Sequence, residues 1–214
     1  MENIVIYGAG GFAREVAHLI EQINAVDQKW NILGFIDDDP NKTGIMVNDW
    51  PILGTFEWFN DNPNANVVLA TGSPKGKQLI VNRLQAFSDL KFPNLFHPSL
   101  KMSRFNQLGI GNVICEGSIL TTNITVGNFV TINLNCTIGH DVEIQDFATI
   151  LPSSSVSGNV VIEEGVDLGT SSSIIPHKRI GSWTIVGAGS VVVKDLPENC
   201  TAVGIPAKPI KYHE

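Results

Sequence analysis

Aliphatic residues recur at intervals of six along the second half of the chain. The series runs without a miss through Leu108, Ile114, Leu120, Val126, Ile132, Ile138, Ile144, Ile150, Val156, Ile162, Leu168, Ile174, Ile180, Val186 and Val192. An α-helix repeats near 3.6 residues and a strand near 2, so this register predicts a solenoid of short parallel strands, a hexapeptide β-helix. Three hexads make one triangular coil of 18 residues, and the run therefore predicts about five coils.

Two further positions of each hexad follow a pattern. Small or β-branched residues stand four places after many of the aliphatics and are expected to share the interior: Ser118, Val130, Cys136, Ala148, Ser154, Val166, Ser172 and Ser190. Glycine often follows the aliphatic directly, at Gly109, Gly127, Gly139, Gly169, Gly181 and Gly187. We expect these glycines at corners whose backbone conformation is costly for a residue with a Cβ.

The filled interior of a β-helix places any functional site on its outside. Residues 18 apart stack on neighbouring coils, so His140 has Thr122 on one side and Gly158 on the other. The absence of a side chain at Gly158 predicts a gap above His140 that can admit a thioester, although the glycine can also serve only to ease a corner. Triangular prisms of this kind leave flat flanks, and we therefore expect a homotrimer with its site in a groove between subunits.

The first 95 residues predict a different domain, a small Rossmann-like α/β unit. The predicted elements are a strand at Asn3–Tyr7, a helix at about Ala13–Ile23, a strand from Ile32 that ends in Asp37, Asp38 and Asp39, a strand at Val67–Ala70, a helix at about Gly76–Phe87, and a last strand at Phe92–Phe96. Residues 96–214 then form the solenoid domain and its tail. The fold class is thus α/β followed by all-β.

Gly8, Gly10 and Ala13 fit the G-x-G-x-x-A form of the dinucleotide fingerprint between a strand and a helix. Backbone N–H groups at such a helix start can hold a phosphate, although the glycines can also serve only to pack helix on strand. Asp37 ends the second strand, where NAD enzymes keep a ribose-binding acid. Fewer than 100 residues provide half of a dinucleotide-binding sheet, so a nucleotide with one sugar fits better than NAD.

Charge and cysteine usage exclude several classes of function. A net charge of −7, a pI near 5.2 and the lack of a long basic run argue against nucleic-acid or anionic-membrane partners. The first apolar stretch is too short for a signal peptide or membrane span, and we expect a cytoplasmic protein. Cys115, Cys136 and Cys200 lack zinc-type spacing, and their odd number argues against a disulfide framework. Cys136 is expected in the core and the other two as incidental thiols.

The order of motifs resembles a known family over nearly the whole chain. The motifs are Gly8-Ala9-Gly10-Gly11, the acids after the second strand, Ile138-Gly139-His140-Asp141, Ser157-Gly158-Asn159-Val160 and Gly204-Ile205-Pro206-Ala207-Lys208. Together they resemble the sialic-acid-O-acetyltransferase-type sugar acyltransferases, nearest to the bacterial N-acetyltransferases of nucleotide-linked 4-amino sugars in glycan biosynthesis. The resemblance implies a left-handed β-helix that binds acetyl-CoA, an α/β domain that binds the nucleotide-linked amino sugar, and a homotrimer.

The resemblance also implies roles for individual residues. His140 becomes the catalytic base and Asp141 its acidic partner. Acetyl-CoA contacts fall on Gly158, Thr170, Ala188, Pro206 and Lys208, and on Thr149, which stands where relatives can carry a second histidine. Nucleotide-sugar contacts fall on Gly10, Gly11, Phe12, Asp37, Asp38, Gly72 and Ser73. Phe12 replaces a histidine found in some relatives, and we expect no metal site.

The chemistry of the residues agrees with this assignment. An amine that attacks a thioester must lose a proton, and imidazole titrates near neutral pH, which suits His140 as general base. A carboxylate at Asp141 would fix the tautomer of the ring, and the backbone N–H at Gly158 would serve the oxyanion. No nucleophile is required, and a covalent route through Cys136 is disfavoured because this residue points inward.

Other classes of function stay open at this level. A γ-type carbonic anhydrase shares the β-helix but needs three converging histidines, whereas only His140 and His177 share a flank. A noncatalytic nucleotide-sugar sensor would lack an acyl-donor groove, and the pairing of His140 with Gly158 counts against it. O-acetylation of a sialic acid or another sugar is the alternative within the enzyme class.

Overall fold

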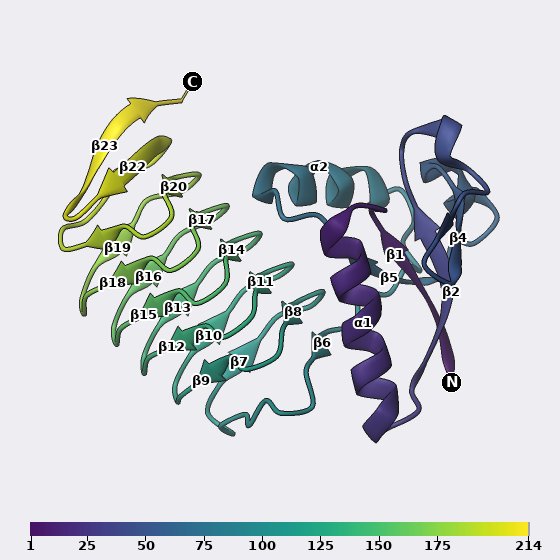
Figure 1. Ribbon diagram of the computed structural model, residues 1–214, viewed down its shortest axis with the longest axis horizontal. Coiled ribbons are helices and arrows are strands. Elements are labelled where there is room, and N and C mark those ends of the chain that lie inside the picture. Colours follow the sequence, from purple (N-terminus) through teal and green to yellow (C-terminus); the bar gives the residue numbers. More distant parts are fainter. Residues whose placement is uncertain (214) are drawn as a thin grey trace. The chain divides into compact units, whose positions relative to one another are not determined.

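The computed structural model describes residues Met1 to His213, and Figure 1 shows their elements in chain order. The chain packs into two compact units. One comprises Met1–Gly72 and Gly76–Pro98, and the other comprises Ser73–Lys75 and the chain from Ser99 onward. No helix within the described residues combines the length and the apolar character needed to cross a bilayer.

The first unit is an α/β fold, as predicted. Its sheet has the order β3-β4-β2-β1-β5, in which β1 pairs in parallel with both β2 and β5. The expectation of a last strand of this sheet at Phe92–Phe96 was wrong, because the strand there is only Leu95–Phe96 and is not one of the five. The elements are β1 (Glu2–Tyr7), α1 (Gly11–Val26), β2 (Trp30–Ile36), β3 (Met46–Val47), β4 (Trp50–Gly54), β5 (Asn66–Leu69), α2 (Pro74–Leu84) and β6 (Leu95–Phe96), with 3-10 turns at Pro40–Lys42 and Phe56–Asn60. The buried stripe of α1 consists of Ala13, Val16, Ala17, Leu19 and Ile20.

The hairpin of β3 and β4 was absent from the predicted elements. Its strand β4 contains Pro51, which donates no ladder hydrogen bond, and this weakens the sequence signal of a strand. Gly34 in β2 explains how β4 approaches so closely. It has a φ of +152°, and a Cβ at this position would lie 2.3 Å from the carbonyl oxygen of Pro51.

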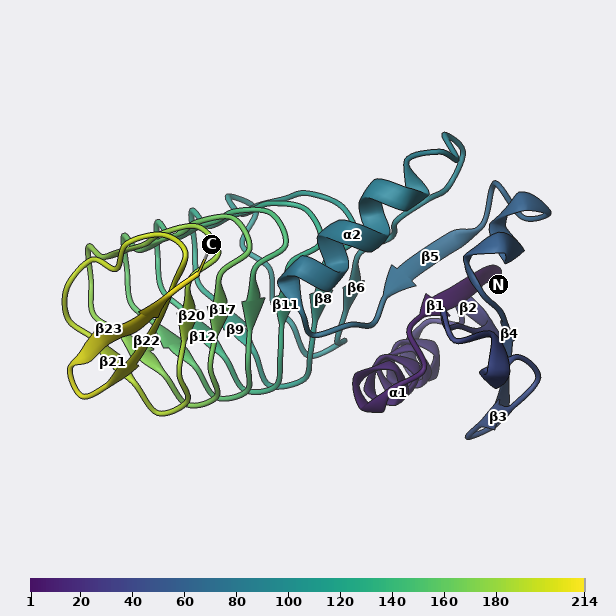
Figure 2. The same ribbon diagram turned by 90° about the horizontal axis from the view of Figure 1, so that it is seen from above.

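The second unit is the predicted left-handed parallel β-helix (Figures 1 and 2). Its two-residue strands form three faces, each stacked at a spacing of 18 residues. Face 1 consists of β7 (Gln107–Leu108), β10 (Thr125–Val126), β13 (Glu143–Ile144), β16 (Val161–Ile162) and β19 (Arg179–Ile180). Face 2 contains β8 (Val113–Ile114), β11 (Thr131–Ile132), β14 (Thr149–Ile150), β17 (Asp167–Leu168) and β20 (Ile185–Val186). Face 3 consists of β9 (Ile119–Leu120), β12 (Thr137–Ile138), β15 (Ser155–Val156), β18 (Ser173–Ile174) and β21 (Val191–Val192).

The interior of the coils follows the hexad pattern. Every aliphatic residue of the series from Ile114 to Val192 is buried, and Leu108 in the first coil is half-buried. The eight small or β-branched residues that were expected to share the interior are buried as well. The predicted division of each hexad between core and surface is therefore confirmed.

The glycines that follow the aliphatics have a different role from the one expected. The left-handed backbone lies two places later, at every sixth residue from Gly111 to Gly189, and most of these residues are not glycine. The glycines themselves instead permit close stacking. At Gly139, for example, a Cβ would lie 2.7 Å from the backbone nitrogen of Gly158 on the next coil.

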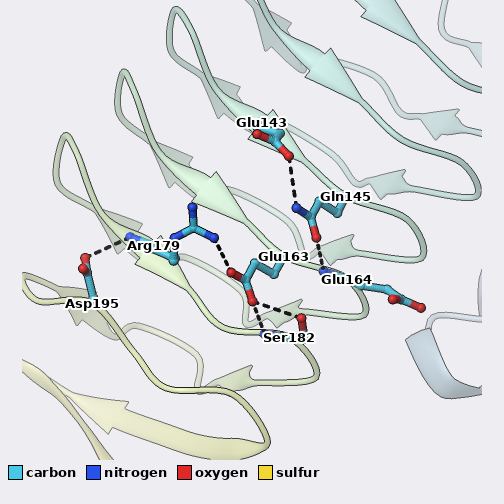
Figure 3. A network of polar contacts seen from close by, with 7 residues as sticks. All are labelled: Glu143, Gln145, Glu163, Glu164, Arg179, Ser182 and Asp195. Atoms are coloured by element: carbon cyan, nitrogen blue, oxygen red, sulfur yellow. Dashed lines mark hydrogen bonds and ion pairs between the residues drawn. The ribbon is translucent and has the colours of Figure 1, made fainter.

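Face 1 carries a chain of polar contacts that ties successive coils together (Figure 3). The Glu163 carboxylate accepts hydrogen bonds from Arg179 and from the backbone N–H and hydroxyl of Ser182, at 2.9 and 3.0 Å for the latter two. Burial raises the pKa of Glu163, but these hydrogen bonds outweigh it and leave the pKa below its ordinary value of 4.5. The network joins residues 16 and 19 positions apart and therefore stabilises the stacking of coils.

The chain closes the solenoid with an antiparallel hairpin of β22 (Cys200–Gly204) and β23 (Ala207–Tyr212). Strand β22 pairs in parallel with β20 and so extends face 2 (Figure 2). The backbone N–H of Gly204 donates to the Ser190 hydroxyl at 3.0 Å, which anchors the hairpin to the last coil.

Candidate active site

His140 and Asp141 lie in the turn between β12 and β13, at the corner where face 3 meets face 1. We call this edge of the solenoid the His140 corner. The Nδ1 atom of His140 is 2.7 Å from Oδ2 of Asp141. Since a carboxylate only accepts, this contact selects the tautomer with hydrogen on Nδ1 and leaves Nε2 with a free lone pair. The His140 side chain is 60% exposed, so a substrate can reach it.

Adjacent residues form this pair because Asp141 has a left-handed backbone with a φ of +58°. Asp and Asn are among the few residues that tolerate this conformation readily. The N–H of Asp141 donates to the carbonyl of Thr122 on the preceding coil at 3.2 Å, and the carboxylate accepts from Asn123 Nδ2 at 3.2 Å. The hydrogen bonds from His140 and then Asn123 hold the pKa of Asp141 below its ordinary value of 3.8.

Gly158 lies against the imidazole of His140, on the next coil of the same corner. A Cβ at Gly158 would lie 2.6 Å from both Cε1 and Nε2 of the ring. The expected gap above His140 is therefore occupied by the ring of His140 itself, and the lack of a side chain at Gly158 leaves room for the imidazole. The backbone N–H of Asn159 donates to the His140 carbonyl at 2.9 Å and locks the two coils in register.

The residues assigned to acetyl-CoA lie mainly across face 3 from His140. Thr170 and Ala188 are exposed in the turns after β17 and β20, where face 2 meets face 3. Pro206 and Lys208 are exposed on the closing hairpin, which Ser190 anchors to the same end of the solenoid. The structure thus places these four residues near one corner and His140 at the other, with face 3 between them.

Thr149 does not fit its assignment to the cofactor. It lies in β14 on face 2, paired with Thr131 and Asp167, and it has no exposed surface. The family position that can hold a histidine is here a buried strand residue, and we leave it out of the site.

His177 lies on the His140 corner, two coils after Asp141 in the same register. It is exposed, and its backbone N–H donates to the Gly158 carbonyl at 3.2 Å. None of the three cysteines forms a disulfide, all three are buried, and burial raises the pKa of the Cys136 thiol. A thiol that is buried and protonated is a poor nucleophile.

The residues assigned to the nucleotide sugar lie at the carboxyl edge of the α/β sheet, except Ser73, which belongs to the second unit. Gly10 is the N-cap of α1 and has no side-chain cap, and the first turn that follows, with Gly11 and Phe12, carries no acid. The helix therefore presents N–H groups to a phosphate without competition from a carboxylate. Gly8 allows the turn to pass over β5, since a Cβ there would lie 2.9 Å from the Ala70 carbonyl oxygen.

Asp37 and Asp38 follow β2 at this same edge, and Gly72 and Ser73 follow β5. Asp37 binds Lys42 Nζ through both carboxylate oxygens at 3.1 Å. Asp38 accepts from the Tyr7 hydroxyl at 2.9 Å and from Arg83 at 2.7 Å. Both acids are thus already oriented by cations.

Sequence reasoning missed four residues that shape the site. Three of them, Tyr7, Lys42 and Arg83, come from three different elements. No local sequence motif predicts that they contact Asp37 and Asp38. Asn123 carried a usable signal, because it precedes Asp141 by one coil of 18 residues and therefore stacks beneath it. The same arithmetic placed Thr122 beneath His140.

Comparisons with known proteins agree with this architecture. Residues 3–84 match the family described as the PglD N-terminal domain. The chain is 28% identical over 220 residues to the GDP-perosamine N-acetyltransferase of Escherichia coli O157:H7, covering 96% of this chain and 95% of that protein.

Two solved structures extend the likeness to nearly the full length. PerB from Caulobacter crescentus, solved in complex with CoA and GDP-perosamine, matches with a TM-score of 0.89 at 27% identity, covering 99% of this chain and 98% of that one. The acetyltransferase domain of PglB from Neisseria gonorrhoeae FA1090, in complex with acetyl coenzyme A, matches with a TM-score of 0.87 at 28% identity, covering 98% and 99%. The chain is therefore similar over nearly its whole length to bacterial nucleotide-sugar N-acetyltransferases, and its N-terminal part matches the PglD N-terminal domain.

Proposed function

We propose that this protein transfers an acetyl group from acetyl-CoA to the amine of a nucleotide-linked 4-amino-deoxysugar. The observation that carries the proposal is the His140–Asp141 pair, in which Nδ1 is bound and Nε2 is free at an exposed corner. GDP-perosamine is the first candidate substrate, because two similar proteins are named for it or solved with it.

In the proposed mechanism, His140 Nε2 accepts the proton that the sugar amine loses as its nitrogen attacks the thioester carbonyl. The new C–N bond gives a tetrahedral intermediate, which collapses by breaking the C–S bond and releases CoA as the thiol. Asp141 stabilises the imidazolium that forms. The imidazolium then donates its proton to the leaving sulfur, and His140 returns to its neutral starting state.

Face 3 suits the acyl-donor arm of acetyl-CoA. Its outward residues are all uncharged: Ile119, Thr137, Ser155, Ser173 and Val191. An uncharged pantetheine arm that runs along this face would join the His140 corner to Thr170, Ala188, Pro206 and Lys208. The oxyanion contact from the Gly158 backbone stays a prediction.

The carboxyl edge of the α/β sheet suits the nucleotide. The uncapped start of α1 offers N–H groups to a phosphate, while Asp37 and Asp38 offer acceptors to hydroxyl or base N–H groups. For nucleotide-sugar binding we propose Gly10, Gly11, Phe12, Asp37, Asp38, Gly72 and Ser73.

We also propose that the protein is a homotrimer, that it is cytoplasmic and that it acts in glycan synthesis. Its two domains are proposed to be residues 1–95 and 96–214.

The test is a turnover assay with acetyl-CoA and a panel of GDP-, UDP- and dTDP-linked 4-amino sugars. Turnover is measured from the free thiol of the released CoA, and the product is identified by NMR. We expect an amide at C4 for at least one sugar, and loss of kcat by about 100-fold in His140→Ala with little change in acetyl-CoA affinity. Wild-type kcat in His140→Ala would exclude this base, and NAD-dependent hydride transfer would exclude the assignment as a whole.

A further inference from the structure

We propose that Asn123 is a positioning residue for the base, the third member of a relay that runs from Asn123 through Asp141 to His140. The inference rests on the proposed function and extends it to a residue on the preceding coil. Asn123 Nδ2 donates to Oδ1 of Asp141 at 3.2 Å, and the other oxygen, Oδ2, holds His140 Nδ1 at 2.7 Å. Each carboxylate oxygen thus has its own donor.

The two bonds together fix the rotation of the Asp141 side chain. A carboxylate that is 46% exposed and held at one oxygen can turn about its χ angles and release the ring. A second donor on the opposite oxygen removes this freedom. Because Asp141 sets the tautomer and direction of His140, Asn123 acts on the base without touching the substrate.

Asn123 is itself held firmly in place. Its neighbours on both sides are tied to other coils: the Thr122 hydroxyl lies 3.0 Å from Ser103 Oγ, and the N–H of Ile124 donates to Asn106 at 3.0 Å. The carbonyl of Thr122 also accepts from Asp141 N–H at 3.2 Å. The corner is therefore rigid enough for one amide to orient a side chain on the next coil.

The competing explanation is conformational, since Asn123 has a φ of +57° and asparagine tolerates this region. Asn135 offers a matched control, because it has a φ of +56° at another corner and is exposed. Glycine at either position keeps the backbone and removes only the amide. Asn123→Asp keeps the size and the tolerance of positive φ, but at neutral pH it cannot donate to Asp141 and repels it.

The experiment compares Asn123→Gly, Asn123→Asp and Asn135→Gly in the full-length protein. Steady-state kinetics use acetyl-CoA and the amino sugar nucleotide that gives turnover in the panel. We expect both Asn123 variants to lower kcat by about 5-fold or more, the scale for one ordinary hydrogen bond, with unchanged KM for both substrates. Asn135→Gly is expected to retain wild-type kcat.

A second readout needs no substrate. Nitrogen-15 NMR of the histidine rings reports the tautomer of His140, and we expect the share protonated at Nδ1 to fall in both Asn123 variants and not in Asn135→Gly. Wild-type kcat and tautomer in Asn123→Gly and Asn123→Asp would overturn the relay. If His140→Ala is inactive while these variants behave as wild type, only the role of Asn123 fails; if His140→Ala keeps its activity, the proposed base fails.

Discussion

Substitution of Gly158 by alanine is expected to lower the catalytic rate at the His140 corner without destabilising the fold. The new Cβ would lie 2.6 Å from Cε1 and Nε2 of His140, whereas ordinary van der Waals contact begins near 3.4 Å. The clash is with the far end of an exposed side chain, so the ring yields by about 0.8 Å and the backbone stays in place. The fold loses little, but the imidazole leaves its position beside Asp141.

The expected cost follows from the displacement. A misplacement of about 1 Å at a reacting group can lower a rate by about 100-fold, so we expect kcat of Gly158→Ala to fall by about 10- to 100-fold. The melting temperature should change by no more than about 2 °C, since no packed backbone is disturbed. Acetyl-CoA affinity should stay near that of the wild type, because the methyl group displaces the ring and leaves face 3 unchanged.

The assay is a double-mutant cycle of Gly158→Ala and His140→Ala with kcat as readout. If the alanine at 158 acts only by moving the ring, it has no further effect once His140 is gone. An equal fall in kcat in both backgrounds would refute this reasoning, and a rise in the acetyl-CoA KM alone would assign Gly158 to cofactor binding instead.

Three further predictions test the solenoid around the site. Gly139→Ala should destabilise the fold by about 1–3 kcal/mol in thermal or urea unfolding, because its Cβ meets the backbone of Gly158 at 2.7 Å; unchanged stability would contradict the close stacking of coils. Glu163, whose pKa is lowered in the folded protein, contributes stability above its ordinary value of 4.5 that is lost as the pH falls through its folded value. Wild type should therefore lose more melting temperature than Glu163→Gln on acidification, and parallel curves would count against the network. Cys136 should resist alkylation under native conditions, since burial raises its pKa; rapid labelling with loss of kcat would reopen a covalent route.

The period of six was sufficient to predict the solenoid, because every aliphatic residue of the series points into the same kind of interior, which is repeated in each coil. The α/β unit was equally readable where strands were long and apolar, as at Ile4 to Tyr7. Its edge hairpin was missed because Pro51 interrupts the alternation, and a strand at a sheet edge buries too little to leave a clear pattern.

Stacking arithmetic placed His140 between Thr122 and Gly158 but did not give the direction of the ring. That direction depends on the left-handed backbone at Asp141, which a hexad pattern does not display. The expected gap over Gly158 was wrong for this reason, since an imidazole held by Asp141 lies over the glycine. The orientation of Asp38 by Tyr7 and Arg83 was equally invisible, because these partners lie 31 and 45 residues away.

The most direct test of the central claim is the product formed from acetyl-CoA and GDP-perosamine by the wild-type protein and by His140→Ala. Because Nε2 is the free base of the His140–Asp141 pair, the wild type should yield GDP-linked sugar acetylated at the 4-amino group, while His140→Ala should form product at least about 100-fold more slowly. Equal rates for the two proteins, or acetylation at a hydroxyl group, would contradict the account.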